Sequence, residues 1–178
     1  ELAGQGLAND EPIGFTAQVG PFAALVAGRQ FGVAADGRFG DLDLDMDLRV
    51  DDLARPVNTQ LNLKVRGPGA DYLGTRFGVR NLGAGPLQLD ASIRPSADGA
   101  GVVAELTGQV GQFSITSHTE LADPTEMRKL RATLQVAGPD LGFAGGLAGV
   151  DRLPAEPFRL AIDVDRAGDT FNIREAVL

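Results

Sequence analysis

Few residues in this chain could do chemistry, and a single histidine is the first to consider. His118 is the only histidine among 178 residues, and the chain has no cysteine. A zinc site and a Ser-His-Asp triad both need such residues in a wider constellation. His118 falls on the polar side of an alternating stretch, so we interpret it as solvent-facing. The sequence thus predicts no catalytic residue, no cofactor and no metal site, and we do not expect an enzyme.

Four aspartates at alternate positions suggest calcium at first sight. They are Asp41, Asp43, Asp45 and Asp47. An EF-hand loop needs glycine at its sixth position, where this stretch has Met46. On a strand, the carboxylates would lie about 6.6–7 Å apart along one face and would not converge on one ion. We therefore interpret them as a charged strand face, which also discourages pairing with other molecules.

Two glycine–proline steps could be mistaken for phosphate loops. Gly67-Pro68-Gly69 and Gly138-Pro139-Asp140 each place proline where such a loop needs a backbone N–H, and no lysine follows at the required position. Both are predicted to be turns. Asp71 or Asp140 could then cap a short helix after each turn. A third turn signal, Asp36-Gly37, predicts a hairpin.

Composition and charge limit the class of protein. The 24 glycines and 10 prolines favour strands and turns over helices. The net charge of −8 argues against nucleic acid as a partner and against docking by charge on an anionic membrane. No apolar run of about 18 residues is present that could cross a membrane as a helix. The chain starts at Glu1 and not at methionine, so we expect an excised fragment of a longer protein.

The clearest structural signal is strict alternation from Leu42 to Val50. Apolar residues occupy the even positions of this stretch, and charged residues occupy the odd ones. Because successive side chains of a strand point to opposite faces, one face is apolar and the other charged. Similar alternation recurs from Thr59 to Arg66 and after Pro86 and Pro157. The sequence therefore predicts an all-β fold with short helices, built on an antiparallel sheet with one apolar face.

An internal repeat organises these strands. Residues 37–99 align without gaps on residues 108–170, with fifteen identical positions where chance gives roughly five. The matches fall on turn glycines, prolines and alternate apolar positions, such as Gly67/Gly138 and Leu89/Leu160. We predict a single domain over 1–178 with two tandem repeats of 71 residues, 37–107 and 108–178. Residues 1–36 would be the end of a preceding unit.

Periodicity alone leaves two architectures open. The apolar face could pack on a second sheet as a closed β-sandwich. Alternatively, the sheet could curl into a groove whose apolar face holds a ligand. In the second case, fifteen residues are expected to face the groove, some of them packing on the short helices: Leu42, Leu44, Met46, Leu48, Leu61, Leu63, Leu87, Leu89, Phe113, Ile115, Leu134, Val136, Phe158, Leu160 and Ile162.

The turn and strand motifs resemble the AsmA family of bacterial envelope proteins. The residues that carry the resemblance are Gly138-Pro139-Asp140-Leu141, Leu153-Pro154 and Pro157-Phe158, and earlier Gly85-Pro86-Leu87-Gln88-Leu89. The resemblance covers roughly residues 37–178. It implies a periplasmic protein of Gram-negative bacteria, anchored in the inner membrane outside this stretch. It also implies a similarity to bridge-like lipid-transfer proteins, in which repeated β-units build a groove for phospholipid.

Three functions remain as expectations. The first is a segment of a periplasmic bridge whose groove shields the acyl chains of phospholipid or another lipid during transport between the membranes and upkeep of the outer membrane. The second is a non-catalytic structural or assembly module of the cell envelope that binds partner proteins through edge strands. A polysaccharide-binding domain is disfavoured, because the chain has nine Phe, one Tyr and no Trp for stacking on sugars.

Overall fold

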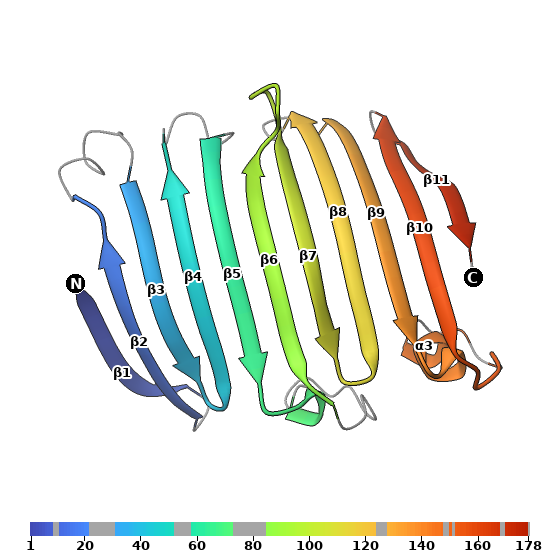
Figure 1. Ribbon diagram of the computed structural model, residues 1–178, viewed down its shortest axis with the longest axis horizontal. Coiled ribbons are helices and arrows are strands. Elements are labelled where there is room, and N and C mark those ends of the chain that lie inside the picture. The colour runs from blue at the N-terminus through green and yellow to red at the C-terminus, as the bar shows by residue number, and fades with distance from the viewer. Residues whose placement is uncertain are drawn as a thin grey trace.

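The computed structural model shows one sheet of strands that follow one another in chain order (Figure 1). It describes residues 1–8, 11–21, 31–51, 58–72, 85–123, 128–147, 150, 152–167 and 170–177. The strands are β1 (Leu2–Ala8), β2 (Glu11–Val19), β3 (Phe31–Phe39), β4 (Leu42–Val50), β5 (Thr59–Gly67), β6 (Leu87–Pro95), β7 (Val102–Val110), β8 (Phe113–Asp123), β9 (Arg128–Gly138), β10 (Phe158–Ala167) and β11 (Thr170–Val177).

The sheet is a single open layer. Its order is β1 to β11 in sequence, and every neighbouring pair is antiparallel. The sheet is curved and open, and Figure 1 shows β1 and β11 at its two lateral edges. Within the described residues, the main contacts between strands join hydrogen-bonded neighbours only. The prediction of an open, curved all-β sheet with short helices is therefore confirmed, and the closed β-sandwich is wrong.

Tight turns explain how so many strands follow one another. Gly40 and Gly111 have positive φ angles of 57° and 62°. Each is the first of only two residues that separate β3 from β4 and β7 from β8. Glycine at this position is typical of the type II′ hairpin, whose twist matches that of the flanking strands. The hairpin predicted at Asp36-Gly37 is wrong, because both residues lie within β3 and the chain turns three residues later.

Strand positions recur at the offset predicted from the sequence. The first residues of β3, β4 and β6 (31, 42 and 87) return 71 residues later as the first residues of β7, β8 and β10 (102, 113 and 158). The last residues of β5 and β9, Gly67 and Gly138, have the same spacing. Positions 37 and 108 fall inside β3 and β7, so a unit made of whole strands begins at 31 and 102. The repeat boundaries in the sequence stay a prediction.

Short helical segments follow two of the strands at the same end of the sheet. Helix α3 (Leu141–Leu147) begins after Asp140, whose Oδ1 accepts a hydrogen bond of 2.9 Å from the backbone N–H of Phe143. This is an N-cap interaction and confirms the predicted role of Asp140. Residues 70–72 are also helical, so Asp71 lies inside the helical turn and not at the N-cap position before it. Residues 73–84, where the rest of the first predicted helix would fall, lie outside the described residues.

Candidate functional site

The register of the strands assembles one continuous apolar face. In a typical row across the sheet, Leu44 pairs with Val65, Val65 with Leu89, and Ile115 with Val136. Cross-strand partners share a face, because side-chain direction alternates along each strand. By this register all fifteen predicted lining residues lie on the same face, from β4 to β10. The opposite face carries the charged and amide side chains, such as Asp45, Lys64 and Asp90, which also lie opposite one another.

Most of that face is neither buried nor fully exposed. Of the fifteen residues, Leu87 is 2 % exposed and Phe113 9 %, whereas Leu134 is 36 % exposed. The other twelve are half-buried. In a closed core, large apolar residues in these positions would be covered by a second layer. Here the neighbours on the same sheet cover their flanks and leave their tips accessible.

The total solvent-accessible surface also indicates that the apolar face is not covered by a second layer. The accessible surface is 11400 Å². A compact monomer of 18.6 kDa exposes about 8200 Å² by the usual scaling with mass. The excess arises because a single layer has two accessible faces. This protein therefore leaves unburied an apolar surface that an ordinary globular domain of its size would bury.

One end of the face is closed by an aromatic cluster. Phe143 of α3 stacks on Phe113 of β8 with ring centroids 5.4 Å apart, and Phe158 of β10 lies 6.3 Å from Phe113. Gly138 on β9 lies between the two strands, and a Cβ there would overlap the ring of Phe113. The glycine lets the rings approach across the sheet. Phe113 and Phe158 thus pack within the protein and contribute little open surface.

The register adds residues to the face that the sequence-based selection omitted. They include Phe39, Val65, Ile93, Leu106 and Val110, which pair with members of the original fifteen or with their neighbours. Alternation within β5 and β6 could have identified Val65 and Ile93. Alternation is harder to recognise in β7, because Val102, Val103 and Ala104 are all apolar. Val103 lies on the opposite, polar face and is nevertheless only 7 % exposed.

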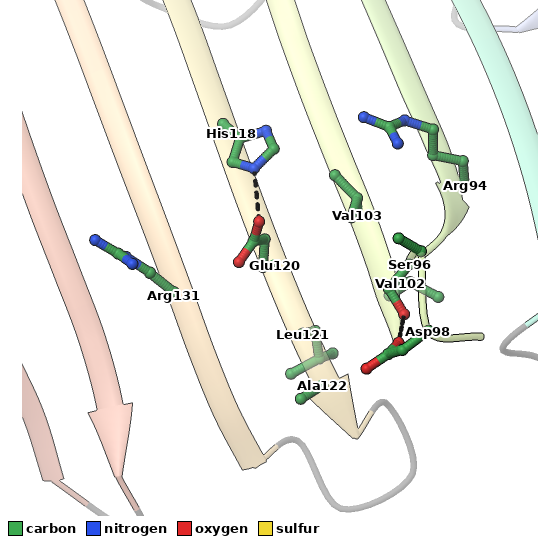
Figure 2. A pocket seen from close by; sticks show the side chains of 11 residues that line it. Arg94, Ser96, Asp98, Val102, Val103, His118, Glu120, Leu121, Ala122 and Arg131 are labelled. Carbon is green, nitrogen blue, oxygen red and sulfur yellow. Dashed lines mark hydrogen bonds and ion pairs between the residues drawn. The ribbon is translucent and has the colours of Figure 1, made fainter. Parts of the chain in front are cut away.

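The polar face has a hollow of its own around Val103 (Figure 2). Its volume is about 420 Å³, and Arg94, His118, Glu120 and Arg131 form its walls together with the Ser96–Asp98 turn. The charges of these walls have partners nearby. Arg94 donates to Glu105 at 3.0 Å, and the His118 ring nitrogens lie 3.5 Å from Glu105 and 3.2 Å from Glu120.

The ion pairs explain why this hollow does not concentrate one sign of charge. The hydrogen bond and positive charge of Arg94, with a smaller effect of His118, hold the pKa of Glu105 below its ordinary value. In the Ser96–Asp98 turn, hydrogen bonds from the Ser96 hydroxyl and the Ala100 N–H lower the pKa of Asp98. Both carboxylates stay ionised at neutral pH, Glu105 beside Arg94 and Asp98 within the hydrogen bonds of its turn. We interpret the charged residues around this hollow as an interstrand ion-pair network, which stabilises the polar face of the sheet.

Several kinds of site are not found in the described part of the chain. No group of three or more His, Asp or Glu side chains there could hold a metal ion. Among the same residues, no helix has the length and apolar character needed to cross a membrane. Comparison with protein-family models, with curated proteins and with solved structures gave no match for this chain.

Proposed function

We propose that this protein holds the acyl chains of a lipid against the apolar face of its open sheet. The observation that carries the proposal is the uncovered state of that face, which has half-buried leucines and valines from β4 to β10. An exposed apolar surface of this extent is costly in water and usually marks an interaction site. An acyl chain is a matching occupant, because it needs no directional contacts.

The energetics favour a fatty chain over a small polar ligand. Each CH₂ group removed from water contributes about 0.8 kcal/mol, so a sixteen-carbon chain gains on the order of 10 kcal/mol from an apolar lining. Polar headgroups would stay in water at the strand ends. The role as one segment of a periplasmic lipid-transfer bridge, and phospholipid as the lipid, rest on the resemblance of the turn motifs to the AsmA family.

The proposal is tested with a matched pair of substitutions on β9. Leu134 is 36 % exposed on the apolar face, so Leu134→Asp introduces a charge there without burying it. Gln135→Asp places the same charge next to it on the exposed opposite face. We expect phospholipid to co-purify with the native chain and with Gln135→Asp, as measured by mass spectrometry of extracted lipid, and to be strongly reduced in Leu134→Asp.

Circular dichroism should show that both variants keep the native strand content. Lipid that is retained equally by Leu134→Asp and Gln135→Asp would contradict binding on the apolar face. A folded native protein that carries no lipid, even after incubation with phospholipid vesicles, would instead favour the structural or assembly module.

A further inference from the structure

The apolar face carries one charge. Among the strand residues whose side chains the structure describes, Arg166 is the only charged residue at a position of that face. It follows Ile162 and Val164 on β10 and pairs with Leu130 on β9. Arg166 is half-buried and lies near the end of β10 that points away from α3 (Figure 1). In a site with a mostly apolar lining, a few polar groups fix the orientation of the ligand.

Two hydroxyl groups lie on the same part of the face. Thr119 pairs with Ala132, which pairs with Val164, the residue before Arg166 on that face of β10. Ser117 lies next to Thr119 on the same face of β8, and both are half-buried. The Cα atoms of Thr119 and Arg166 are about 12 Å apart by strand geometry. Arg166, Thr119 and Ser117 thus form one region, the polar end of the face, which extends from β8 to β10.

The first half of the sheet has no such region at the equivalent positions. Seventy-one residues before Arg166, Thr119 and Ser117, the chain has Pro95, Leu48 and Met46. The three corresponding strands form with apolar residues in these positions, so strand formation does not require the polar ones. The polar end is therefore a chemical feature that the second half carries on a shared strand plan.

We propose that the polar end binds the anionic headgroup of the lipid, with the acyl chain extending across the sheet toward the first half. The inference rests on the proposed function and adds the charge of the headgroup and the direction of the chain. A guanidinium binds phosphate or carboxylate with two parallel hydrogen bonds. It has five N–H donors, so Arg166 can bind an anion and keep contacts within the protein. The hydroxyls of Thr119 and Ser117 can donate to oxygens closer to the chain.

The width of the sheet suits this placement. Five strand spacings separate β10 from β5, a distance of about 24 Å. One leaflet of a bilayer, with acyl chains and headgroups, is about 20–22 Å thick. A lipid with its headgroup at Arg166 therefore reaches β5 with the end of its tail, at Leu61. The neighbours of Leu61 are Leu48 and Ile93, so the tail would lie on bulky apolar side chains.

Two lipids that share one chain test the charge of the headgroup. Hexadecyl phosphate and hexadecanol each compete with a neutral fluorescent alcohol, and the ratio of their affinities measures the effect of the anion. The native chain should bind hexadecyl phosphate about tenfold more tightly than hexadecanol, and Arg166→Gln should bind the two equally. Arg159→Gln removes the same charge from the exposed polar side of β10 and should keep the native ratio. Inorganic phosphate at about 1 mM should displace neither lipid, because it lacks the chain.

Fatty acids that carry a nitroxide test the direction of the chain. Because the native chain has no cysteine, Leu61→Cys and Ala132→Cys each provide a single thiol for a fluorophore. The two positions lie four strand spacings apart, about 19 Å. A nitroxide beside the carboxylate should quench the fluorophore at position 132 more strongly, and a nitroxide at the methyl end should quench the fluorophore at position 61 more strongly.

Several results would overturn the inference. Equal affinity of the native chain for the two lipids would do so and would leave the apolar face as a lipid site without a headgroup contact. An equal loss of preference in Arg159→Gln and Arg166→Gln would assign the preference to the charge of the whole molecule. Displacement of hexadecyl phosphate by inorganic phosphate would assign Arg166 to the free anion, and quenching in the reverse order would reverse the lipid. A chain that binds neither lipid would overturn the proposed function together with this inference.

Discussion

The two halves of the apolar face, β3–β6 and β7–β10, share one strand plan but differ in the middle of their strands. Four central positions in the first half carry Val33, Met46, Leu48 and Leu61, and 71 residues later the second half has Ala104, Ser117, Thr119 and Ala132. Register places these positions together, since Val33 pairs with Leu48 and Leu48 with Leu61, while Ala104 pairs with Thr119 and Thr119 with Ala132.

The difference reverses at two other positions of the same face, where Ala35 and Ala91 of the first half correspond to the larger Leu106 and Ile162 of the second. It also reverses at one end of the strands. Leu42 and Leu87 in the first half correspond to Phe113 and Phe158 in the second, where the rings pack with Phe143. The four central positions of the second half together have about half as many side-chain heavy atoms as those of the first half, and they include two hydroxyl groups. The same strand plan therefore carries side chains of different volume at corresponding positions of the two halves.

The largest predicted effect is at the aromatic end. Phe113→Ala should lower the free energy of unfolding by about 3–4 kcal/mol, because Phe113 is 9 % exposed and packs against two rings. The equivalent Leu42→Ala, at a half-buried position, should cost only about 1–2 kcal/mol. Urea denaturation of both variants measures the difference. Equal losses would show that the two ends are packed equally and that the comparison of the halves fails.

The next effect concerns lipid and depends on the proposed function. Leu61→Asp removes a bulky residue from the centre of the first half, whereas Ala132→Asp changes a small one at the same position of the second. If acyl chains contact the bulky positions, Leu61→Asp should weaken binding of a fluorescent fatty acid about tenfold, and Ala132→Asp about two- to threefold. A larger loss in Ala132→Asp would place the acyl chains on the second half instead.

Sequence alone could predict much of this architecture. Alternation from Leu42 to Val50 and from Thr59 to Arg66 depends only on strand geometry, so the strands and their apolar side followed directly. The cap of α3 followed from Asp140, because an N-cap is a local interaction. Asp36-Gly37 misled the prediction, since the same dipeptide that favours a turn can also occupy a strand, and Gly40 makes the turn.

Other features depend on pairing between distant residues and left no local signal. The ion pair of Arg94 with Glu105 spans two strands, and the burial of Val103 on the polar face depends on its flanking partners Arg94 and Glu120. The choice between an open and a closed sheet also had no local signal. Alternation gives the apolar side of each strand but does not say whether a second layer covers it.

The polar faces of the two halves differ as well, and a double-mutant cycle measures how much. Arg131 lies 3.6 Å from Asp163, whose other oxygen is buried with no hydrogen-bond partner within the described structure. The first half has Gln60 and Ser92 at these positions. Arg131→Gln alone should cost about 1 kcal/mol, because it leaves the carboxylate without its cation.

Converting both positions to the residues of the first half should restore most of that loss. Asp163→Ser removes the carboxylate that needs the arginine, so the double variant should unfold within about 0.5 kcal/mol of the native chain. Urea denaturation of the four proteins gives the coupling energy. Additive losses would mean that the pair contributes nothing and that the two polar faces are energetically alike.

The smallest effect is expected from Glu105, whose counterpart in the first half is Ala34. Arg94 lowers the pKa of Glu105 from its ordinary value of 4.5 in the folded protein. A carboxylate with a lowered folded-state pKa stabilises the fold above its unfolded value, and the contribution is lost as the pH falls through the folded value. The difference in melting temperature between the native chain and Glu105→Gln should therefore be constant from pH 7 to about 5 and shrink below 4.5.

In an Arg94→Gln background the same difference should be small at every pH, because the main cause of the shift is gone. Glu105 is exposed, so the total change should be modest and should decrease with added salt. A difference that grows on acidification would mean that Glu105 is more easily protonated in the folded protein than in the unfolded chain. The ion pair of Arg94 on β6 with Glu105 on β7, which joins the two halves, would then not stabilise the fold.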